Sequence, residues 1–373
     1  MNRINLNHLT LTLLTLLFAG CSSDSPNDSQ GTNQGNKDEI NLNAQVWQVM
    51  QASAPRRAHT YDNAAALQAQ ASFTASAYVE NTTTSYINPE QVNYENDKWV
   101  WRDGKHYWPA TGSLDFFAYM PATKPSYITG PTYSIVESAP QATFTCSNMP
   151  MIYNATATDP TAGQGSSLQE FIWGITIGQN KTNQGTSGVT MKFRHPFACI
   201  KFQLAASHPD IIINSITFKG LKTGGTCTLT NTDIAESYYY TKSVWSELTG
   251  SSDLVMQLVE KDDKGKFKIT NSNGDIIVND AAKFHSNPAS VVPIGGYSDD
   301  NHQYVSLLVI PQEFAGKIEV NAGWNDWGDT PVEHTVTATI PAITWAAGTS
   351  YTYTFNITLE DLVVNLTDFT EQW

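Results

Sequence analysis

The chain has 373 residues, with 21 lysines and arginines against 35 aspartates and glutamates, which gives a formal net charge of −14 at pH 7. It has no basic cluster that could neutralise phosphates, so nucleic acid is excluded as an expected partner. The length suggests about two domains of ~100–200 residues each, and cores of that size fold without disulfides or metals.

The N-terminus predicts a secretion signal that ends at a cysteine. Arg3 precedes an apolar run over residues 9–19, and a small residue separates this run from Cys21. The run is too short to cross a bilayer core of ~30 Å, which needs ~20 apolar residues, so it indicates a cleaved signal and not an anchoring helix. We expect residues 1–21 to form a lipoprotein signal peptide that ends with an acylated Cys21, for example with palmitate. Ordinary signal cleavage is the alternative.

Residues 22–43 are expected to form a flexible tether. The stretch from Ser22 to Lys37 contains no large apolar side chain. It cannot bury enough surface to offset the entropy lost on ordering. The tether would hold a folded body away from the outer membrane, with the acyl chains of Cys21 in the bilayer.

The folded body is predicted to consist mainly of β-strands. The best helix candidate is short, residues 62–71, with Asp62 in the capping position. Strands are indicated where apolar and polar side chains alternate, because alternate residues of a strand face the same side. This pattern occurs in residues 73–79, 114–120, 200–204, 216–218, 336–340 and 351–360. Turn signals at 264–265 and 273–274 bracket a further short strand.

We therefore expect an all-β protein with two antiparallel β-sandwich domains in tandem. A stretch rich in glycine, asparagine and threonine, residues 178–188, separates them, and a long hairpin loop is the alternative interpretation of this stretch. The predicted parts are an N-terminal sandwich over 44–185, a C-terminal sandwich over 186–360 and a tail strand over 361–373.

Besides Cys21, the chain contains Cys146, Cys199 and Cys227. An odd number permits at most one internal disulfide, and Cys199–Cys227 is the conceivable pair within one domain. Buried free thiols are the alternative. The spacing of the cysteines does not fit metal ligands, so no metal centre is expected.

No catalytic constellation is recognisable, and we expect neither enzyme activity nor a cofactor. The motifs of a nucleophile elbow, a zinc-protease helix and a phosphate-binding loop are all absent. His195 lies in a strand-like pattern and is interpreted as a structural histidine bonded to the backbone. Residues 262–265 and 271–275 resemble pieces of calcium loops but lack the ligand spacing and the closing glutamate, so we interpret them as turns.

Several short motifs occur along the chain in an informative order. They are Trp101, Tyr107-Trp108-Pro109, Gly112, and the segments 114–121, 191–195, 308–312 and 345–353. Together they resemble the fimbrillin family of lipoprotein type V pilins, and within it the branch similar to minor fimbriae. The resemblance runs from about Gln45 to about Leu359. It implies two β-sandwich domains of transthyretin-like type, export as a lipidated precursor and assembly at the outer surface.

The resemblance also implies trimming by an arginine-specific protease. Arg56 and Arg57 are the only adjacent basic pair in the chain. Cleavage there would remove the first strand of the N-terminal sandwich, which we expect at Ala44–Met50. The alternative is that both arginines are ordinary solvated loop residues. An anchor subunit would also stay untrimmed.

The C-terminal tail is a candidate donor strand. A sandwich that lacks one strand exposes unpaired backbone groups beside an open core, where a strand of another chain can pair. Leu362, Val364 and Leu366 share one face of the tail, and its ~12 residues can extend ~40 Å. An intramolecular edge strand is the alternative.

We interpret the chain as a structural subunit of a surface pilus or pilus-like adhesin at the outer membrane and cell surface, in a shaft, tip or anchor position. Its expected partners are other pilin subunits, the outer membrane, and a host, bacterial or glycan receptor. The rival hypothesis is a surface glycan-binding lipoprotein, because the chain has 10 tryptophans and 16 tyrosines, and Trp324 and Trp327 lie between glycines. Most aromatic side chains are nevertheless expected in the cores.

Overall fold

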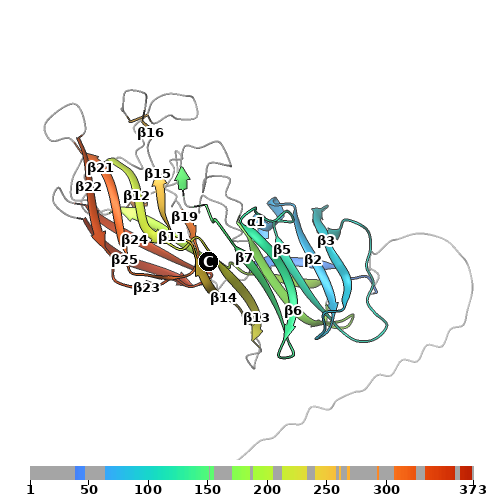
Figure 1. Cartoon of the computed structure of the whole chain (residues 1–373). Coiled ribbons are helices and arrows are strands. Elements are labelled where there is room, and N and C mark those ends of the chain that lie inside the picture. Colours follow the sequence, from blue (N-terminus) through green and yellow to red (C-terminus); the bar gives the residue numbers. More distant parts are fainter. Residues whose placement is uncertain are drawn as a thin grey trace, which may run out of the picture. The chain divides into compact units, whose positions relative to one another are not determined.

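The computed structural model describes residues 38–46, 64–150, 152–154, 170–184, 188–204, 212–232, 240–257, 260–261, 267–268, 292–293, 306–324, 332–357 and 362–371. Residues 37–373 form one compact unit. Its regular structure is almost entirely β-strand (Figure 1), so the prediction of an all-β fold is confirmed. Within the described ranges no helix is both long and apolar enough to span a bilayer.

The described residues of the first part of the chain form one short helix and ten strands. They are β1 (Leu42–Val46), α1 (Ala64–Ala69), β2 (Ser72–Val79), β3 (Ser85–Glu95), β4 (Lys98–Trp101), β5 (Leu114–Met120), β6 (Ile128–Val136), β7 (Ala139–Cys146), β8 (Ile152–Asn154), β9 (Ile172–Gln179) and β10 (Val189–Phe193). The helix predicted at 62–71 and the strands predicted at 73–79 and 114–120 are confirmed.

The second part contains strands only, within the residues that the structure describes. They are β11 (Ala198–Leu204), β12 (Ile212–Leu221), β13 (Gly224–Thr232), β14 (Tyr240–Thr249), β15 (Ser252–Gln257), β16 (Glu260–Lys261), β17 (Phe267–Lys268), β18 (Val292–Pro293), β19 (Ser306–Val309), β20 (Glu313–Phe314), β21 (Lys317–Trp324), β22 (Val332–Thr339), β23 (Ile343–Thr344), β24 (Thr349–Ile357) and β25 (Leu362–Glu371).

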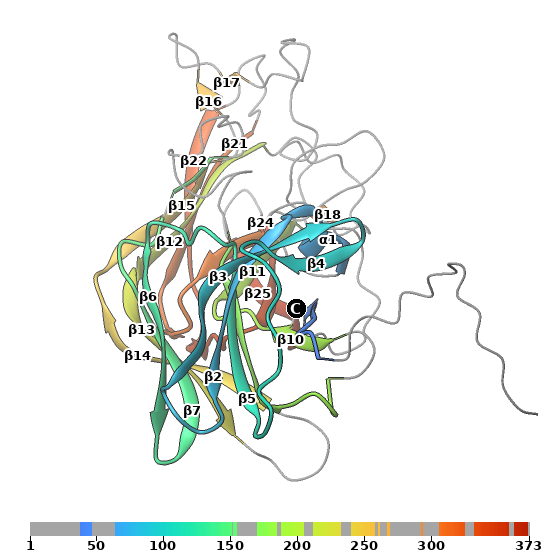
Figure 2. The same cartoon turned by 90° about the vertical axis from the view of Figure 1, so that its right-hand side faces the viewer.

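A seven-stranded sheet dominates the first part, with strand order β10-β1-β4-β3-β2-β5-β9. Figure 2 shows β2, β3 and β5 side by side in it. The two outer strands meet where β10 ends, because Trp173 of β9 forms a bridge with Arg194, the residue directly after β10. The Trp173 N–H donates to the Arg194 carbonyl at 3.2 Å, and the Arg194 N–H donates to the Trp173 carbonyl at 2.8 Å. The sheet therefore curls until its two outer strands touch.

One face of this sheet lines a core, and the other face is also covered at β2, β5 and β9. One face carries a core that includes Phe73, Phe116 and Phe193. The other face packs against the four-stranded sheet β14-β13-β7-β6. An aromatic cluster lies between these two sheets, in which Phe144 meets Trp173 edge-on with ring centroids 4.6 Å apart. Aromatic rings in such edge-to-face contacts stabilise cores beyond the burial of their area.

Two further sheets pack against each other as a second sandwich, in addition to the two-stranded sheets β16-β17 and β20-β23. The strand orders of the two sandwich sheets are β22-β21-β12-β15-β8 and β18-β11-β24-β25, with β19 also paired to β11. The core between them includes Phe202, Phe218 and Trp345. Strand β11 contributes side chains to two cores. Ile200 packs in the core of the second sandwich, and Cys199 packs in the aromatic cluster of the first part.

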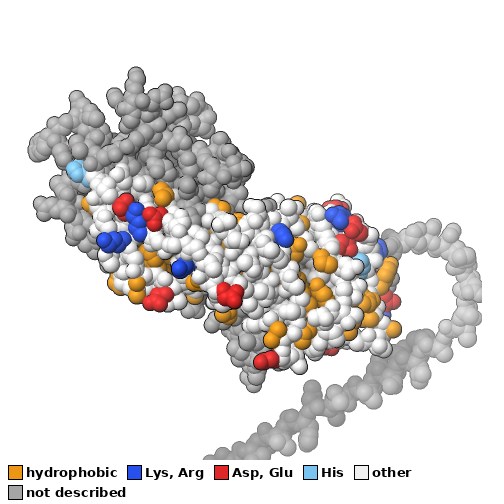
Figure 3. All heavy atoms as spheres, in the orientation of Figure 1, with side chains coloured by type: hydrophobic (Ala, Val, Ile, Leu, Met, Phe, Trp, Pro, Cys, Tyr) orange, Lys and Arg blue, Asp and Glu red, His pale blue; other side chains and the backbone are white. Residues whose placement is uncertain are grey.

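Strand pairing crosses the predicted division at 185/186. Strand β10 pairs with β1, and β13 pairs with β7, although β10 and β13 follow residue 186. The predicted division therefore does not coincide with a division between the sheets, and the domain limits stay a prediction. On the face drawn in Figure 3, lysines and arginines lie scattered among acidic side chains and form no basic patch within the described residues.

Candidate assembly site

Strand β1 lies between β10 and β4 in the seven-stranded sheet. It pairs in parallel with β10 over its whole length, from Leu42 opposite Val189 to Val46 opposite Phe193. Leu42 also pairs with Trp99 of β4 in antiparallel orientation. The strand expected at 44–50 thus begins at Leu42, and residues 47–50 lie outside the described residues.

The side chains of β1 complete a core. Leu42, Ala44 and Val46 are 5%, 7% and 5% exposed, and they belong to the same core as Phe73 and Phe193. Gln45, between two of them, is exposed. This alternation is what a strand with one buried face requires. Full burial of an aliphatic side chain stabilises a fold by about 1.5–3 kcal/mol, so β1 is an integral part of this sandwich.

The residues that precede β1 pair with the loop after β4. The Ile40 N–H donates to the His106 carbonyl at 2.8 Å, and the Trp108 N–H donates to the Asp38 carbonyl at 2.8 Å. The indole N–H of Trp101 donates to the Ile40 carbonyl at 3.1 Å. These hydrogen bonds fix the residues that precede β1 as well as the strand itself. We call residues 38–46 the inserted segment.

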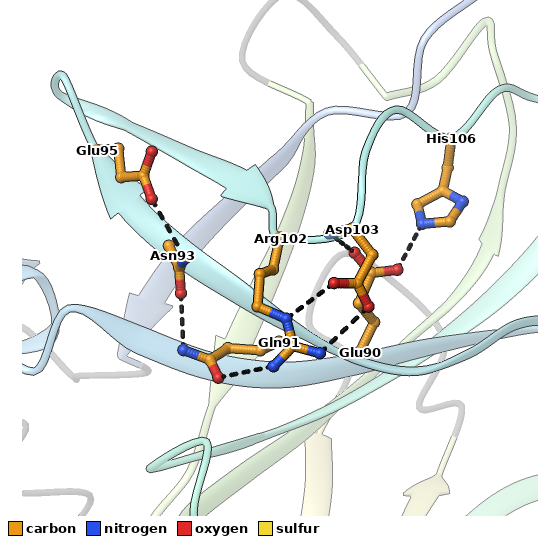
Figure 4. Close-up of polar contacts among 7 residues, drawn as sticks. All are labelled: Glu90, Gln91, Asn93, Glu95, Arg102, Asp103 and His106. Carbon is orange, nitrogen blue, oxygen red and sulfur yellow. Dashed lines mark hydrogen bonds and ion pairs between the residues drawn. The ribbon is translucent and has the colours of Figure 1, made fainter.

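Glu90 of β3 fixes the shape of this loop (Figure 4). One carboxylate oxygen accepts the Asp103 backbone N–H at 2.7 Å, and the other lies 2.7 Å from Nε2 of His106. Arg102 and Asp103 form an exposed ion pair at 2.9 Å, and the hydrogen bond from Arg102 lowers the pKa of Asp103. The Glu90 side chain is itself buried. Its two contacts stabilise the loop conformation in which the His106 carbonyl accepts the Ile40 N–H.

The loop before β10 contacts the other flank of the inserted segment. The Val189 N–H donates to the Asn41 carbonyl at 2.8 Å. Gly188, with φ +83°, lies so close that a Cβ atom would be 2.3 Å from the Asn41 carbonyl oxygen. Lys181 forms an ion pair with Asp38. Glycine adopts this left-handed conformation without strain, so residue 188 suits both the turn and the close approach.

The C-terminal tail is the edge strand β25. It pairs in antiparallel register with β24, from Leu362 opposite Ile357 to Glu371 opposite Thr349. Val364 is half-buried against the core of the second sandwich. This is the intramolecular arrangement that the sequence left open as an alternative. To act as a donor strand, β25 must separate from β24. The donor role of the tail stays a proposal.

Other predicted site residues are placed as follows. Cys21, Arg56, Arg57 and Trp327 lie outside the described residues, as do the turns predicted at 262–265 and 271–275. Trp324 ends β21, where it pairs with Val332. The tryptophans whose side chains the structure describes are all buried or half-buried, namely Trp99, Trp101, Trp108, Trp173, Trp245 and Trp345. These six contribute to the protein interior.

His195 has a partner that the sequence did not indicate. Its Nδ1 lies 2.6 Å from a carboxylate oxygen of Glu170, and both side chains are 1% exposed. The expected partner was a backbone group. A carboxylate 25 residues away in sequence leaves no local signal, so sequence patterns could not identify it. The pair lies at the start of the link between β10 and β11.

The three described cysteines are buried thiols that form no disulfide. The Cys199–Cys227 disulfide is therefore absent, and the alternative of buried thiols is confirmed. Burial raises the pKa of Cys146 to about 12 and also raises that of Cys227. Within the described ranges, no group of histidine, cysteine, aspartate or glutamate side chains is placed to hold a metal ion.

The protein is therefore all-β, and a strand near its N-terminus, β1, completes a sandwich. The chain matches the fimbrillin-like family over residues 57–373, and it belongs to that family. The resemblance seen in the sequence is thus confirmed. This is a family of structural fimbrial proteins and not of enzymes, so the chain is a pilus subunit, and the family suggests association with other pilin subunits.

Several solved structures are similar to this chain, and the first named here shares its fold. A fimbrial protein from Bacteroides vulgatus ATCC 8482 is 15% identical with a TM-score of 0.54, over 90% of this chain and 100% of that chain. A fimbrial assembly protein from Parabacteroides distasonis ATCC 8503 is 9% identical with a TM-score of 0.36, over 88% and 99%. The tip fimbrial protein Mfa3 from Porphyromonas gingivalis is 10% identical with a TM-score of 0.30, over 85% and 97%. No curated protein matches the chain.

Proposed function

We propose that this pilus subunit is exported as a lipoprotein through Cys21, trimmed after Arg56 or Arg57, and assembled by donor-strand addition. The observation that carries the proposal is the position of β1. The strand fills a place between β10 and β4 and buries three side chains, yet it precedes the arginine pair in sequence. A cut at Arg56 or Arg57 separates it covalently from the rest of the sandwich.

Loss of β1 would leave a site that binds an extended strand. The backbone groups of β10 that pair with Leu42–Val46 would lose their partners beside an open core that contains Met191 and Phe193. Unpaired strand edges are templates for another strand. A donor strand supplies the backbone bonds, and its alternate side chains fill the groove.

The tail supplies a matching strand. Leu362, Val364 and Leu366 have the same two-residue spacing as the three buried side chains of β1. Among the described residues of the monomer, β25 has one strand neighbour, β24. Release of β25 therefore breaks a single ladder of backbone bonds. The place of β1 in the next subunit offers five residue pairs with β10 and one with β4, against nine in the β24–β25 ladder, so deeper burial of the apolar face has to drive the exchange.

The proposal is tested on protein extracted from the cell surface. We expect a ladder of polymers on a gel run without strong heating, and an N-terminus at Arg57 or Ala58. The variant with Arg56→Lys and Arg57→Lys keeps both charges but removes the arginine-specific cut, so it should stay monomeric and start at Cys21. Arg102→Lys, a change at an exposed arginine elsewhere, is the control and should polymerise. Polymers that start at Cys21 would refute trimming, and a wild-type monomer would refute donor-strand assembly.

A further inference from the structure

The inserted segment is held on both flanks by contacts that need no covalent link to residue 57. On one flank, residues 38–40 bond to the carbonyl of His106, the N–H of Trp108 and the indole of Trp101. On the other flank, the whole of β1 pairs with β10. A nick in the chain after β1 removes none of these bonds.

Apolar burial adds to the backbone bonds. Ile40 is 1% exposed, and the three inward side chains of β1 are 7% exposed or less. All four pack in the core that contains Phe73 and Phe193. If the segment left, these side chains and the groove would both enter water, which opposes release.

Charged contacts secure the outer end of the segment. Glu39 lies 2.7 Å from the ammonium of Lys105, and Asp38 pairs with Lys181. The two lysines come from different loops, so the segment is bonded from two sides. Exposed ion pairs contribute little to stability, but these two add to the backbone bonds at the N-terminal end of the segment.

We propose that residues 38–46 stay bound in their groove after the chain is cut, so that the N-terminal fragment is a noncovalent ligand of its own subunit. This inference extends the proposed function. Cleavage alone then does not free a subunit from its lipid anchor. The subunit leaves only when another strand displaces the fragment, and the open groove is never exposed to water between the two events.

The binding can be tested without the natural protease or a polymer. A chain that starts at residue 22 carries an affinity tag at its N-terminus and a recognition sequence for a site-specific protease directly after Arg57. After folding and cutting, the mixture is passed over tag-binding resin in native buffer. We expect the body to be retained through the tagged fragment and to elute only when urea is added.

A matched pair of variants tests whether the groove is the contact. Val46→Ala removes buried methyl groups of β1, whereas Gln45→Ala changes an exposed neighbour. Val46→Ala should shorten the half-life of the complex about tenfold, because loss of a buried aliphatic group costs about one decade in affinity. Gln45→Ala should leave the half-life unchanged. Both changes are small truncations, and the melting curve of the uncut chain shows that each variant folds.

Two results would overturn the inference. One is a body that passes through the resin directly after the cut. The other is retention that Val46→Ala and Gln45→Ala weaken equally, because such binding would not involve the groove. Failure of the proposed function is a separate result, in which the cut complex is retained normally but surface protein is untrimmed or never polymerises.

Discussion

Gly188 lies against the carbonyl group of Asn41, at a distance that leaves no room for a side chain. A Cβ atom at residue 188 would be 2.3 Å from the Asn41 oxygen, and the backbone has φ +83°. The adjacent Val189 N–H donates to the same oxygen at 2.8 Å. The turn before β10 is therefore shaped around the inserted segment.

Gly188→Ala should destabilise the intact chain by about 2–4 kcal/mol, because a left-handed alanine and a clash with Asn41 both add cost. Gly112→Ala is the control, since Gly112 has φ +90° but no atom within 4 Å of the added Cβ. It should cost only about 1 kcal/mol. Urea unfolding of the two variants measures the difference. Equal losses would show that residue 188 does not accommodate the inserted segment.

The buried pair of His195 and Glu170 predicts a purely structural effect. His195→Ala should lower the free energy of unfolding by about 3–5 kcal/mol, because it leaves the Glu170 carboxylate without this partner in the core. His106→Ala is the matched control. It breaks a pair with Glu90 of similar length, 2.7 Å, but the imidazole is 29% exposed, so water replaces part of the lost contact and the loss should be smaller. Equal losses in thermal melts would contradict this prediction.

The alternation of side chains predicted the strands whose large apolar side chains all lie on one face. Strand β24 is an example, with Tyr351, Tyr353 and Phe355 buried in one core. Strand β5 is different, because Phe116 packs in one core and Phe117 in another. Alternation alone predicts one buried face, and it gives no sign that a strand separates two cores.

Partners that are distant in sequence could not be predicted. The pairing of Cys227 opposite Phe144, between β13 and β7, carries strands across the expected domain division. Local patterns fix which residues of a strand face inward but not which strand lies beside it. The candidate site shows the same limit. The resemblance indicated an N-terminal strand, but its parallel partner β10 and the support from Glu90 emerge only from the folded chain.

Cys21 is expected to anchor the precursor. In Cys21→Ala cells, labelled fatty acid should no longer enter the protein, and the protein should leave the outer-membrane fraction, because no acyl chain remains to partition into the bilayer. Fractionation and fatty-acid labelling measure both effects. Cys146→Ala is the control, since a buried thiol is not available for acylation. Wild-type labelling of the Cys21→Ala protein would contradict the lipoprotein assignment.

The buried thiols predict a loss of stability at alkaline pH. Burial raises the pKa of Cys146 from an ordinary value of 9.0 to about 12. Above about pH 9 the unfolded thiol loses its proton while the folded thiol keeps it, so the unfolded state binds fewer protons and is favoured as the pH rises. The free energy of unfolding should fall by about 1 kcal/mol per pH unit for this group. Urea unfolding at several pH values should show a shallower fall for Cys146→Ala, and an unchanged slope would refute the assignment.

The tail can be tested because Val364 has different surroundings in the monomer and in the proposed polymer. In the monomer Val364 is half-buried beside the core, opposite Phe355. In the groove it would take a position like that of the inward-facing side chains of β1, which are 7% exposed or less. A polar group tolerates the first position better than the second, because water still reaches it there.

Val364→Thr should therefore lower the melting temperature of the monomer slightly but strongly reduce the polymer ladder. Asn365→Asp, at the neighbouring position on the opposite face of the strand, is the control and should polymerise normally. Replacing Leu362, Val364 and Leu366 together with Asp should abolish assembly, since each carboxylate would be buried without a partner, at a cost of several kcal/mol. A triple variant that polymerises would exclude the tail as donor. If Val364→Thr unfolds the monomer as severely as it impairs assembly, β25 is an ordinary core strand, and the donor must come from elsewhere in the chain.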